Sequence, residues 1–351
     1  MNGALFRRLA AATSAWLTLL APPIALLAWL AGQAAWPYVL AAFLVAPLVF
    51  ERVMAALRGN RTRSKHRWMN AFGLGAVLLP LTVFGAFARL ALAPRTVGLA
   101  VLVAWVALAL HARRRGTIVH DVPLKLRLPT LSRAIRLVQL SDVHVGSRDA
   151  AFLERVVTQA IAHAPELVVI TGDLLDESRV GAAELAALAR FECPVFLSLG
   201  NHERYVNLAR AITAIETHGV RVLRDEWTVH GPLRLIGIDD RDRPDALPDV
   251  LARVPVDPEH VDVLLYHRPD GWAAARAKGI PLTLSGHTHG GQIWPFGLLV
   301  KRRYPDTIGR FERDGTTLYV SSGTGTWGPA LRLGTRSEMT VIDLVPDRSE
   351  R

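Results

Sequence analysis

The chain has 351 residues, a formal net charge of +10 and a single cysteine. Its positive charge belongs to one end: residues 1–120 carry 13 Lys and Arg against one acidic residue, whereas residues 121–351 carry 28 Lys and Arg against 30 Asp and Glu. This imbalance argues against a basic surface over the whole chain, so no nucleic-acid partner is expected. The lone Cys193 excludes an intrachain disulfide.

The N-terminal third has the composition of a membrane region. Residues 9–50 form an uncharged run of 42, too long for one helix across a bilayer, which needs about 20 residues, and suited to two. Further apolar stretches cover residues 71–92 and 96–112. We therefore expect an all-α transmembrane region with four spans over residues 1–115. A cleaved signal peptide is the competing interpretation of the N-terminus, because Arg7 and Arg8 precede an apolar segment.

Basic residues predict the orientation of these spans. They cluster before the first span, between the second and third, and after the fourth: Arg7 and Arg8; Arg52, Arg58, Arg61, Arg63, Lys65 and Arg67; and Arg113, Arg114 and Arg115. Lys and Arg collect in cytoplasmic loops, so the N-terminus and the C-terminal domain are expected on the cytoplasmic side of a multi-pass membrane protein. Binding of lipid head groups is an alternative use of the middle cluster.

Beyond a linker at residues 116–134, short β-rich runs alternate with helical patterns. Strands are expected at 135–141, 166–172 and 194–200, each followed by a helical segment, and five or more strand-like runs follow between residues 220 and 345. The first series is typical of a parallel α/β sheet. The number of strands predicts an α/β domain over residues 135–345, built as a two-sheet β-sandwich flanked by helices.

Polar residues follow five of these strands. They are Asp142 and His144; Asp173; Asn201 and His202; His267; and His287 and His289. The last pair lies in "GHTHGGQ", which alone fits a metal site, a glycine-rich phosphate loop or a turn. Ligands bind at the carboxyl ends of strands in α/β sheets, so the five sites are expected to converge. Imidazole, carboxylate and amide donors suit Mn, Fe, Zn or Co, and a carboxylate can bridge two such ions.

Asp-x-His, Gly-Asp, Gly-Asn-His-Glu, a single His after a strand and Gly-His-x-His, in this order, resemble the calcineurin-like metallophosphoesterase superfamily. The sequences "GHTHGGQIWPFG" and "SSGTGTWGPALRLGTRSEMTVIDL" resemble its membrane-attached bacterial members. Four predicted spans exceed the single N-terminal anchor of that group, so the expected location in the bacterial inner membrane rests on the charge pattern and not on the resemblance. The resemblance implies two divalent metal ions. One would be held by Asp142, His144, Asp173 and His289, and Asp173 would bridge to a second ion held by Asn201, His267 and His287. It also implies that His202 faces the substrate as a catalytic proton donor.

The function expected from this resemblance is hydrolysis of a phosphomonoester, phosphodiester or pyrophosphate by a metal-bound hydroxide. The expected partners are a phosphorylated small-molecule or lipid substrate, for example UDP-diacylglucosamine, and the lipid bilayer. Arg332, and more weakly Arg268, are candidates for binding the substrate phosphate. A catalytically inactive membrane scaffold or sensor with the same fold is the alternative function, and a transporter is disfavoured because the spans contain no internal acidic residue. Asp176 and Glu203 are left open between supporting the ligands and starting helices.

Overall fold

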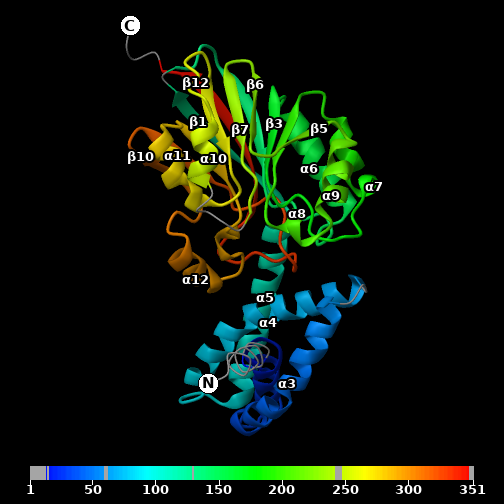
Figure 1. The fold of residues 1–351 in the computed structure, drawn as a ribbon. Helices are drawn as coiled ribbons and strands as arrows, with labels where there is room; N and C mark the ends of the chain where they lie inside the picture. Colours follow the sequence, from blue (N-terminus) through cyan, green and yellow to red (C-terminus); the bar gives the residue numbers. More distant parts are fainter. Residues whose placement is uncertain (1–12, 14–15, 59–61, 129, 242–246, 348–351) are drawn as a thin grey trace. The chain divides into compact units, whose positions relative to one another are not determined.

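The computed structural model describes residues 13, 16–58, 62–128, 130–241 and 247–347. Arg7, Arg8 and Arg61, three of the basic residues used to predict orientation, lie outside them. The chain divides into two compact units (Figure 1). The first unit comprises Met1–Arg114 and Gly328–Leu333, and the second comprises Arg115–Trp327 and Gly334–Arg351.

The first unit is helical. Its elements are a π-helical turn η1 (Trp16–Leu20) and the helices α2 (Ala21–Leu30), α3 (Trp36–Arg58), α4 (Thr62–Ala88) and α5 (Pro94–Thr117). Apolar side chains from α2, α4 and α5 form its core around Trp29, which is almost fully buried. Gly98 of α5 permits this packing, because a Cβ atom there would lie 2.9 Å from the backbone nitrogen of Leu30.

Among the described residues, two helical segments are long and apolar enough to cross a membrane, His66–Ala88 and Pro94–Thr117. The prediction of four spans is therefore wrong for the 42-residue run. A turn at residues 31–35 divides that run, leaving the apolar helix Trp16–Leu30 and the uncharged part of α3 before Glu51. Within the described residues each piece has about 15 residues, which corresponds to about 22 Å of helix and is short of the roughly 30 Å of a hydrocarbon core.

The second unit contains two six-stranded sheets. The first has the order β1-β12-β2-β3-β4-β5, with β1 parallel to β12, β12 antiparallel to β2, and β2 to β5 parallel. Its strands are β1 (Val119–Leu128), β2 (Ile135–Leu140), β3 (Leu167–Thr171), β4 (Val195–Ser198), β5 (Val220–Leu223) and β12 (Ser337–Pro346). Residues 119–128 were assigned to a linker, but they form a ten-residue strand because β12 supplies a full-length hydrogen-bonding partner.

The second sheet has the order β10-β11-β9-β8-β7-β6, with a parallel centre and antiparallel pairs at both edges. Its strands are β6 (Glu226–His230), β7 (Leu233–Gly237), β8 (Val261–Leu265), β9 (Leu282–Ser285), β10 (Gly309–Arg313) and β11 (Thr316–Val320). Leu137, Leu235 and Leu284 belong to one buried apolar cluster that joins the two sheets face to face. Neighbouring residues on the same strands, such as Val138, point to the opposite face, as the two-residue period of a strand requires.

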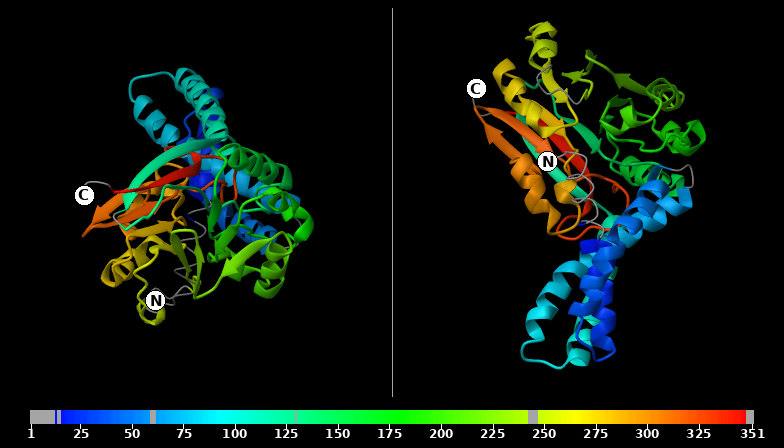
Figure 2. Two further views of the ribbon diagram at one scale, coloured as in Figure 1. Left: turned by 90° about the horizontal axis from the view of Figure 1, so that it is seen from above. Right: turned by 60° about the horizontal axis from the view of Figure 1, so that its bottom comes forward.

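Helices cover the outer faces of both sheets. The helices of this unit are α6 (Ala150–Ala162), α7 (Ala182–Leu185), α8 (His202–Tyr205), α9 (Leu208–Glu216), α10 (Leu247–Arg253), α11 (Trp272–Lys278) and α12 (Phe296–Arg303), with the short 3-10 helices η2 (Ala186–Arg190), η4 (Pro269–Gly271) and η5 (His289–Gly291). Residues of α6 and α9 pack in the cluster on the first sheet, and residues of α10 and α11 in the cluster on the second. The two views in Figure 2 show the strands lying between these helices. The predicted two-sheet fold flanked by helices is confirmed.

Candidate metal centre

The residues predicted to bind metal come from loops at the carboxyl ends of strands in both sheets. Asp142 and His144 follow β2, Asp173 follows β3, and Asn201 follows β4 in the first sheet. His267 follows β8 in the second sheet, and His287 and His289 follow β9. Because the two sheets face each other, their strand ends bring these loops together, as expected for ligands at the ends of parallel strands.

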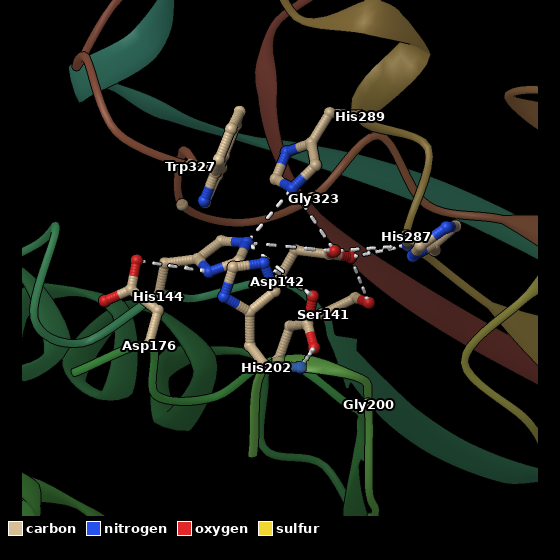
Figure 3. A network of polar contacts seen from close by, with 12 residues as sticks. Ser141, Asp142, His144, Asp176, Gly200, His202, His287, His289, Gly323 and Trp327 are labelled. Carbon is tan, nitrogen blue, oxygen red and sulfur yellow. Dashed lines mark hydrogen bonds and ion pairs between the residues drawn. The ribbon is translucent and has the colours of Figure 1, made fainter. Parts of the chain in front are cut away.

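One group of donors consists of Asp142, His144 and His289 (Figure 3). The Nε2 atoms of His144 and His289 are 3.1 Å apart, and His289 Nε2 lies 3.3 Å from Asp142 Oδ1. Each of the three side chains offers a donor atom within 4.8 Å of the others. These are three of the four residues predicted for the first ion.

A second group consists of Asp173, His267 and His287. His267 Nε2 lies 3.2 Å from Asp173 Oδ2 and 3.2 Å from His287 Nδ1. The same oxygen of Asp173 is 4.0 Å from His144 Nε2 in the first group. Asp173 therefore lies where one carboxylate can serve both groups.

Several of these residues adopt a backbone conformation that side chains usually avoid. The φ angles are 52° at Asp142, 54° at His144, 53° at Asp173, 71° at His287 and 48° at His289. A non-glycine residue in this left-handed region costs on the order of 1 kcal/mol, and such strain concentrates at functional sites. The surrounding fold therefore stabilises a strained backbone conformation at five of the seven predicted ligands, and this conformation sets the direction of their side chains.

Glycines allow the loops to approach the carboxylates closely. The backbone N–H of His287 donates to both carboxylate oxygens of Asp142, each at 3.1 Å. A Cβ atom on Gly286 would lie 2.2 Å from Asp142 Oδ2. Similarly, a Cβ atom on Gly200 would lie 2.2 Å from Asp173 Oδ1. Both distances are far below van der Waals contact, so glycine is required at each position.

Hydrogen bonds orient the imidazole rings. His267 Nδ1 lies 2.8 Å from the carbonyl oxygen of Thr171. A carbonyl oxygen only accepts, so Nδ1 carries a hydrogen, and Nε2, which faces Asp173, is the ring atom available to a metal ion. Asp176 Oδ2 lies 3.5 Å from His144 Nδ1, an ion-pair contact that also restricts the orientation of that ring. Asp176 is itself fixed, because the backbone N–H of Ser147 donates to its Oδ1 at 2.9 Å.

Glu203 holds the backbone of two ligand loops. Its Oε2 accepts from the N–H of Asp173 at 3.0 Å and of Gly200 at 2.8 Å, and its Oε1 accepts from the N–H of Leu175 at 3.1 Å. The carboxyl group is fully buried. Burial, followed by the negative charge of Asp173, raises the pKa of Glu203 to about 7. The question left open by the sequence is answered: Glu203 braces the loops after β3 and β4.

The electrostatics of the cluster favour a bound cation. Burial opposes ionisation of Asp173, but His267, His202 and His144 outweigh it and lower the pKa of this carboxyl. Burial also opposes the charged form of His267, yet Asp173 and then Asp142 raise its pKa well above the ordinary value. Burial and the charge of His267 lower the pKa of His287 to about 3. In the absence of metal, a proton is thus held beside Asp173, while His287 is neutral and able to donate its lone pair.

One buried oxygen supports the fit of this cluster to metal ions. Asn201 is buried, and none of the described residues gives its side-chain Oδ1 a hydrogen-bonding partner. Buried polar atoms are nearly always satisfied, so such an atom points to a missing ligand. Together with the imidazole and carboxylate groups, it completes a donor set that suits divalent transition metals. The residues present therefore fit the predicted metal ions.

His202 begins helix α8 beside the donors. Its backbone N–H donates to Asp173 Oδ1 at 2.8 Å, and its ring lies 4.7 Å from that of His144 and 6.3 Å from that of Trp327, centroid to centroid (Figure 3). His144, Asp173 and His202 form a third group whose donor atoms are close enough for a metal. Burial lowers the pKa of His202 to about 4, so its imidazole is neutral near neutral pH.

The two arginines predicted to bind phosphate lie in different environments. Arg332 belongs to the segment Gly328–Leu333 of the first unit, where its backbone N–H donates to the carbonyl oxygen of Ala112 at 2.8 Å and its side chain is fully buried. Arg332 thus belongs to the first unit, whereas the metal ligands belong to the second. Its contact with a substrate phosphate stays a prediction. Arg268 Nε donates to Asp240 Oδ2 at 2.7 Å, which pairs its charge within the second unit.

Sequence reasoning missed two residues that contact the cluster. Ser141 Oγ donates to Asp142 Oδ2 at 2.6 Å, and the Tyr304 hydroxyl lies 3.1 Å from His287 Nε2. Ser141 precedes a predicted ligand at a strand end, which is a usable signal. Tyr304 is 17 residues from His287, beyond helix α12, and its proximity depends on the fold.

A buried set of histidines and carboxylates at the shared edge of two sheets defines a metal-binding α/β protein. The family model described as calcineurin-like phosphoesterase matches residues 135–291. The chain is 34% identical over 230 residues to an uncharacterized metallophosphoesterase of Campylobacter jejuni, covering 62% of this chain and 61% of the relative. It is 32% identical over 227 residues to an uncharacterized metallophosphoesterase of Aquifex aeolicus, covering 60% of this chain and 85% of the relative.

The chain belongs to the calcineurin-like phosphoesterase family. It is also 31% identical over 252 residues to a protein of Danio rerio named transmembrane protein with metallophosphoesterase domain, covering 64% of this chain and 56% of the relative. The chain thus spans about three fifths of the length of its Campylobacter relative and somewhat less of the fish relative. Membership confirms the predicted family, whereas the match to its membrane-attached bacterial members stays a prediction.

Proposed function

We propose that this chain is a metal-dependent phosphoesterase with two divalent ions in its active site. The observation that carries the proposal is the position of Asp173. Its Oδ2 lies 3.2 Å from His267 in one donor group and 4.0 Å from His144 in the other. A carboxylate between two donor groups is the arrangement that a two-metal site requires.

The ions would acidify a water molecule and polarise the phosphoryl oxygens, in a site held by the seven residues Asp142, His144, Asp173, Asn201, His267, His287 and His289. The protein fixes the donors by hydrogen bonds to Thr171 and Glu203 and by the ion-pair contact of Asp176 with His144. Such bracing keeps donor atoms in place without reorganisation during the reaction. Mn, Fe, Zn and Co all accept this donor set.

His202 is the residue we assign to the leaving group. Its lowered pKa, about 4, makes the ring neutral at neutral pH, so it acts by donating a hydrogen bond from its one ring N–H to the departing oxygen. The backbone bond from His202 to Asp173 holds the ring at the start of α8, next to the donors. A neutral histidine in this place stabilises developing negative charge and does not repel the metal ions.

We also propose that α4 and α5 anchor the enzyme in the bacterial inner membrane. Exposed apolar side chains on these helices, including Phe84, Phe87, Leu99 and Val103, suit contact with lipid. Basic residues precede α4 and end α5, which favours a cytoplasmic phosphoesterase unit. An enzyme in this place has access to a lipid-linked phosphate or pyrophosphate, and UDP-diacylglucosamine is one such compound.

The test is a screen of the full-length protein in detergent. Chelator-treated protein is supplied with Mn, Fe, Co or Zn and assayed on bis-p-nitrophenyl phosphate, on phospholipids and on nucleotide-linked lipids. Turnover that returns with metal is expected, and absence of turnover with all four metals would favour the inactive scaffold. His202→Ala should retain metal and lose most activity on substrates with poor leaving groups. An active alkaline phosphatase fusion at the C-terminus would contradict the cytoplasmic placement.

A further inference from the structure

Helix α12 has an unusual surface for a helix of a folded domain. Four of its eight residues are apolar, yet none of the eight is buried. Leu298 is 65% exposed and Leu299 is 68% exposed. Short helices normally gain their stability by packing an apolar face into a core. In Figure 1, α12 lies apart from α10 and α11, which cover the second sheet.

The outward face of α12 combines leucine with positive charge. Leu298 and Leu299 precede Arg302 by four and three residues, so all three share one face. Lys301 and Arg303 flank this face and are also exposed. The helix contains no acidic residue. A face of this kind buries its leucines while its long basic side chains reach toward negative charge.

Two exposed tryptophans lie in the loop before α12 and in a second loop that is hydrogen-bonded to it. Trp294 precedes α12 and is 45% exposed, and Trp327 lies in another loop and is 52% exposed. Gln292 joins the two loops, because its Nε2 donates to the carbonyl oxygen of Trp327 and its Oε1 accepts from the N–H of Trp327, each at 3.0 Å. We define the interfacial face as Trp294, Leu298, Leu299, Arg302 and Trp327.

We propose that the interfacial face binds the surface of a bilayer that contains anionic lipids. Exposed leucines account for insertion at the boundary of the acyl chains, and tryptophan favours the depth of the head groups. The basic residues Lys301 and Arg302 complement anionic phosphates, whereas Arg303 forms an ion pair with Asp270 at 3.3 Å. This docking goes beyond the proposed function, which places only α4 and α5 in the membrane.

The interfacial face borders the candidate metal centre. The ring of Trp327 lies 6.3 Å from that of His202 (Figure 3), and Tyr304, directly after α12, contacts His287. Docking through this face therefore brings the donors close to head-group phosphates. The binding itself does not require catalysis, so it is tested separately from hydrolysis.

The test uses the full chain reconstituted in phosphatidylcholine vesicles with or without phosphatidylglycerol. In a Cys193→Ala background, an environment-sensitive fluorophore is attached at Leu298→Cys, and quenching by spin-labelled lipid is measured. Val256→Cys is the matched control. Val256 is also an exposed apolar residue, but it lies before β8, at the end of the strand opposite to the metal ligand His267. We expect strong quenching at 298, increased by phosphatidylglycerol, and little at 256.

Charge reversal in Lys301→Glu/Arg302→Glu should reduce docking by more than about fivefold for each basic residue replaced, because removal of one basic charge alone costs about that factor. Hydrolysis of soluble bis-p-nitrophenyl phosphate by these variants should match that of the parent. Equal quenching at 298 and 256, or quenching unchanged by the charge reversal, would overturn the proposal. Energy transfer between labels at 298 on separate copies, without dependence on anionic lipid, would instead assign the face to self-association. If the parent hydrolyses no substrate, the quenching result still decides this proposal.

Discussion

Replacement of Glu203 by glutamine tests whether buried hydrogen bonds to the backbone hold the ligand loops. The carboxylate accepts from three N–H groups, those of Asp173, Leu175 and Gly200. The amide of glutamine has one oxygen, so at least one buried N–H loses its acceptor and meets an NH2 group. A buried donor left unsatisfied costs about 1–3 kcal/mol. Glu203→Gln should therefore destabilise the protein by about that amount, a large share of a typical stability of about 5–15 kcal/mol.

The same variant should bind metal more weakly, by about 10- to 100-fold, because the backbone of Asp173 loses its support. Denaturant unfolding of the metal-free protein and calorimetric titration with Mn measure the two effects. Glu192→Gln, at an exposed position, is the control and should change neither. The reasoning is refuted if Glu203→Gln unfolds like the parent and binds metal with the same affinity.

Further predictions concern the same cluster. Gly286→Ala would place a Cβ atom 2.2 Å from Asp142 Oδ2, so it should lower the metal occupancy measured by elemental analysis. Gly315→Ala is the control and should leave occupancy unchanged, because a Cβ atom there meets no neighbour within 4 Å. Asp173→Asn should reduce occupancy of both ions, and loss of only one would contradict a shared carboxylate. Asp173 raises the pKa of His267, so a proton competes with metal at this ring more strongly than at an ordinary histidine. Metal affinity should therefore rise from pH 6 to pH 8 with proton release, measured by titration calorimetry in buffers of different ionisation enthalpy, and a pH-independent affinity would contradict it. Chelation should lower the thermal midpoint, and Mn should restore it.

The sequence was sufficient to predict that the candidate metal ligands converge, because strand ends can be found from short apolar runs. Asp142 and Asp173 directly follow such runs, and parallel strands bring their ends to one edge. The strained φ angles at five ligands were not predictable, since Asp and His occupy ordinary conformations elsewhere. The roles of Glu203 and Asp176 depended on distances between loops that only the folded chain defines.

Two predictions about secondary structure, the four membrane spans and the linker, were wrong for local reasons. The run of residues 9–50 has the composition of two spans joined by a turn, but the helical pieces on either side of residues 31–35 are each too short within the described residues. Residues 124–128 alternate apolar and basic side chains, which is typical of a half-buried strand, and residues 119–128 pair with β12 along their whole length, so the prediction of a linker missed this pattern. Hydropathy indicates whether a segment can lie in an apolar environment, whereas the neighbouring strand or helix determines which secondary structure the segment forms.

The most direct test of the account is a joint measurement of metal content and phosphodiester hydrolysis on the purified full-length protein. Two divalent ions per chain are predicted, with hydrolysis of bis-p-nitrophenyl phosphate that is abolished by chelation and restored by one of Mn, Fe, Co or Zn. Binding of two ions without hydrolysis under any of these conditions would contradict the assignment as an enzyme, and binding of no ion would contradict the metal centre itself.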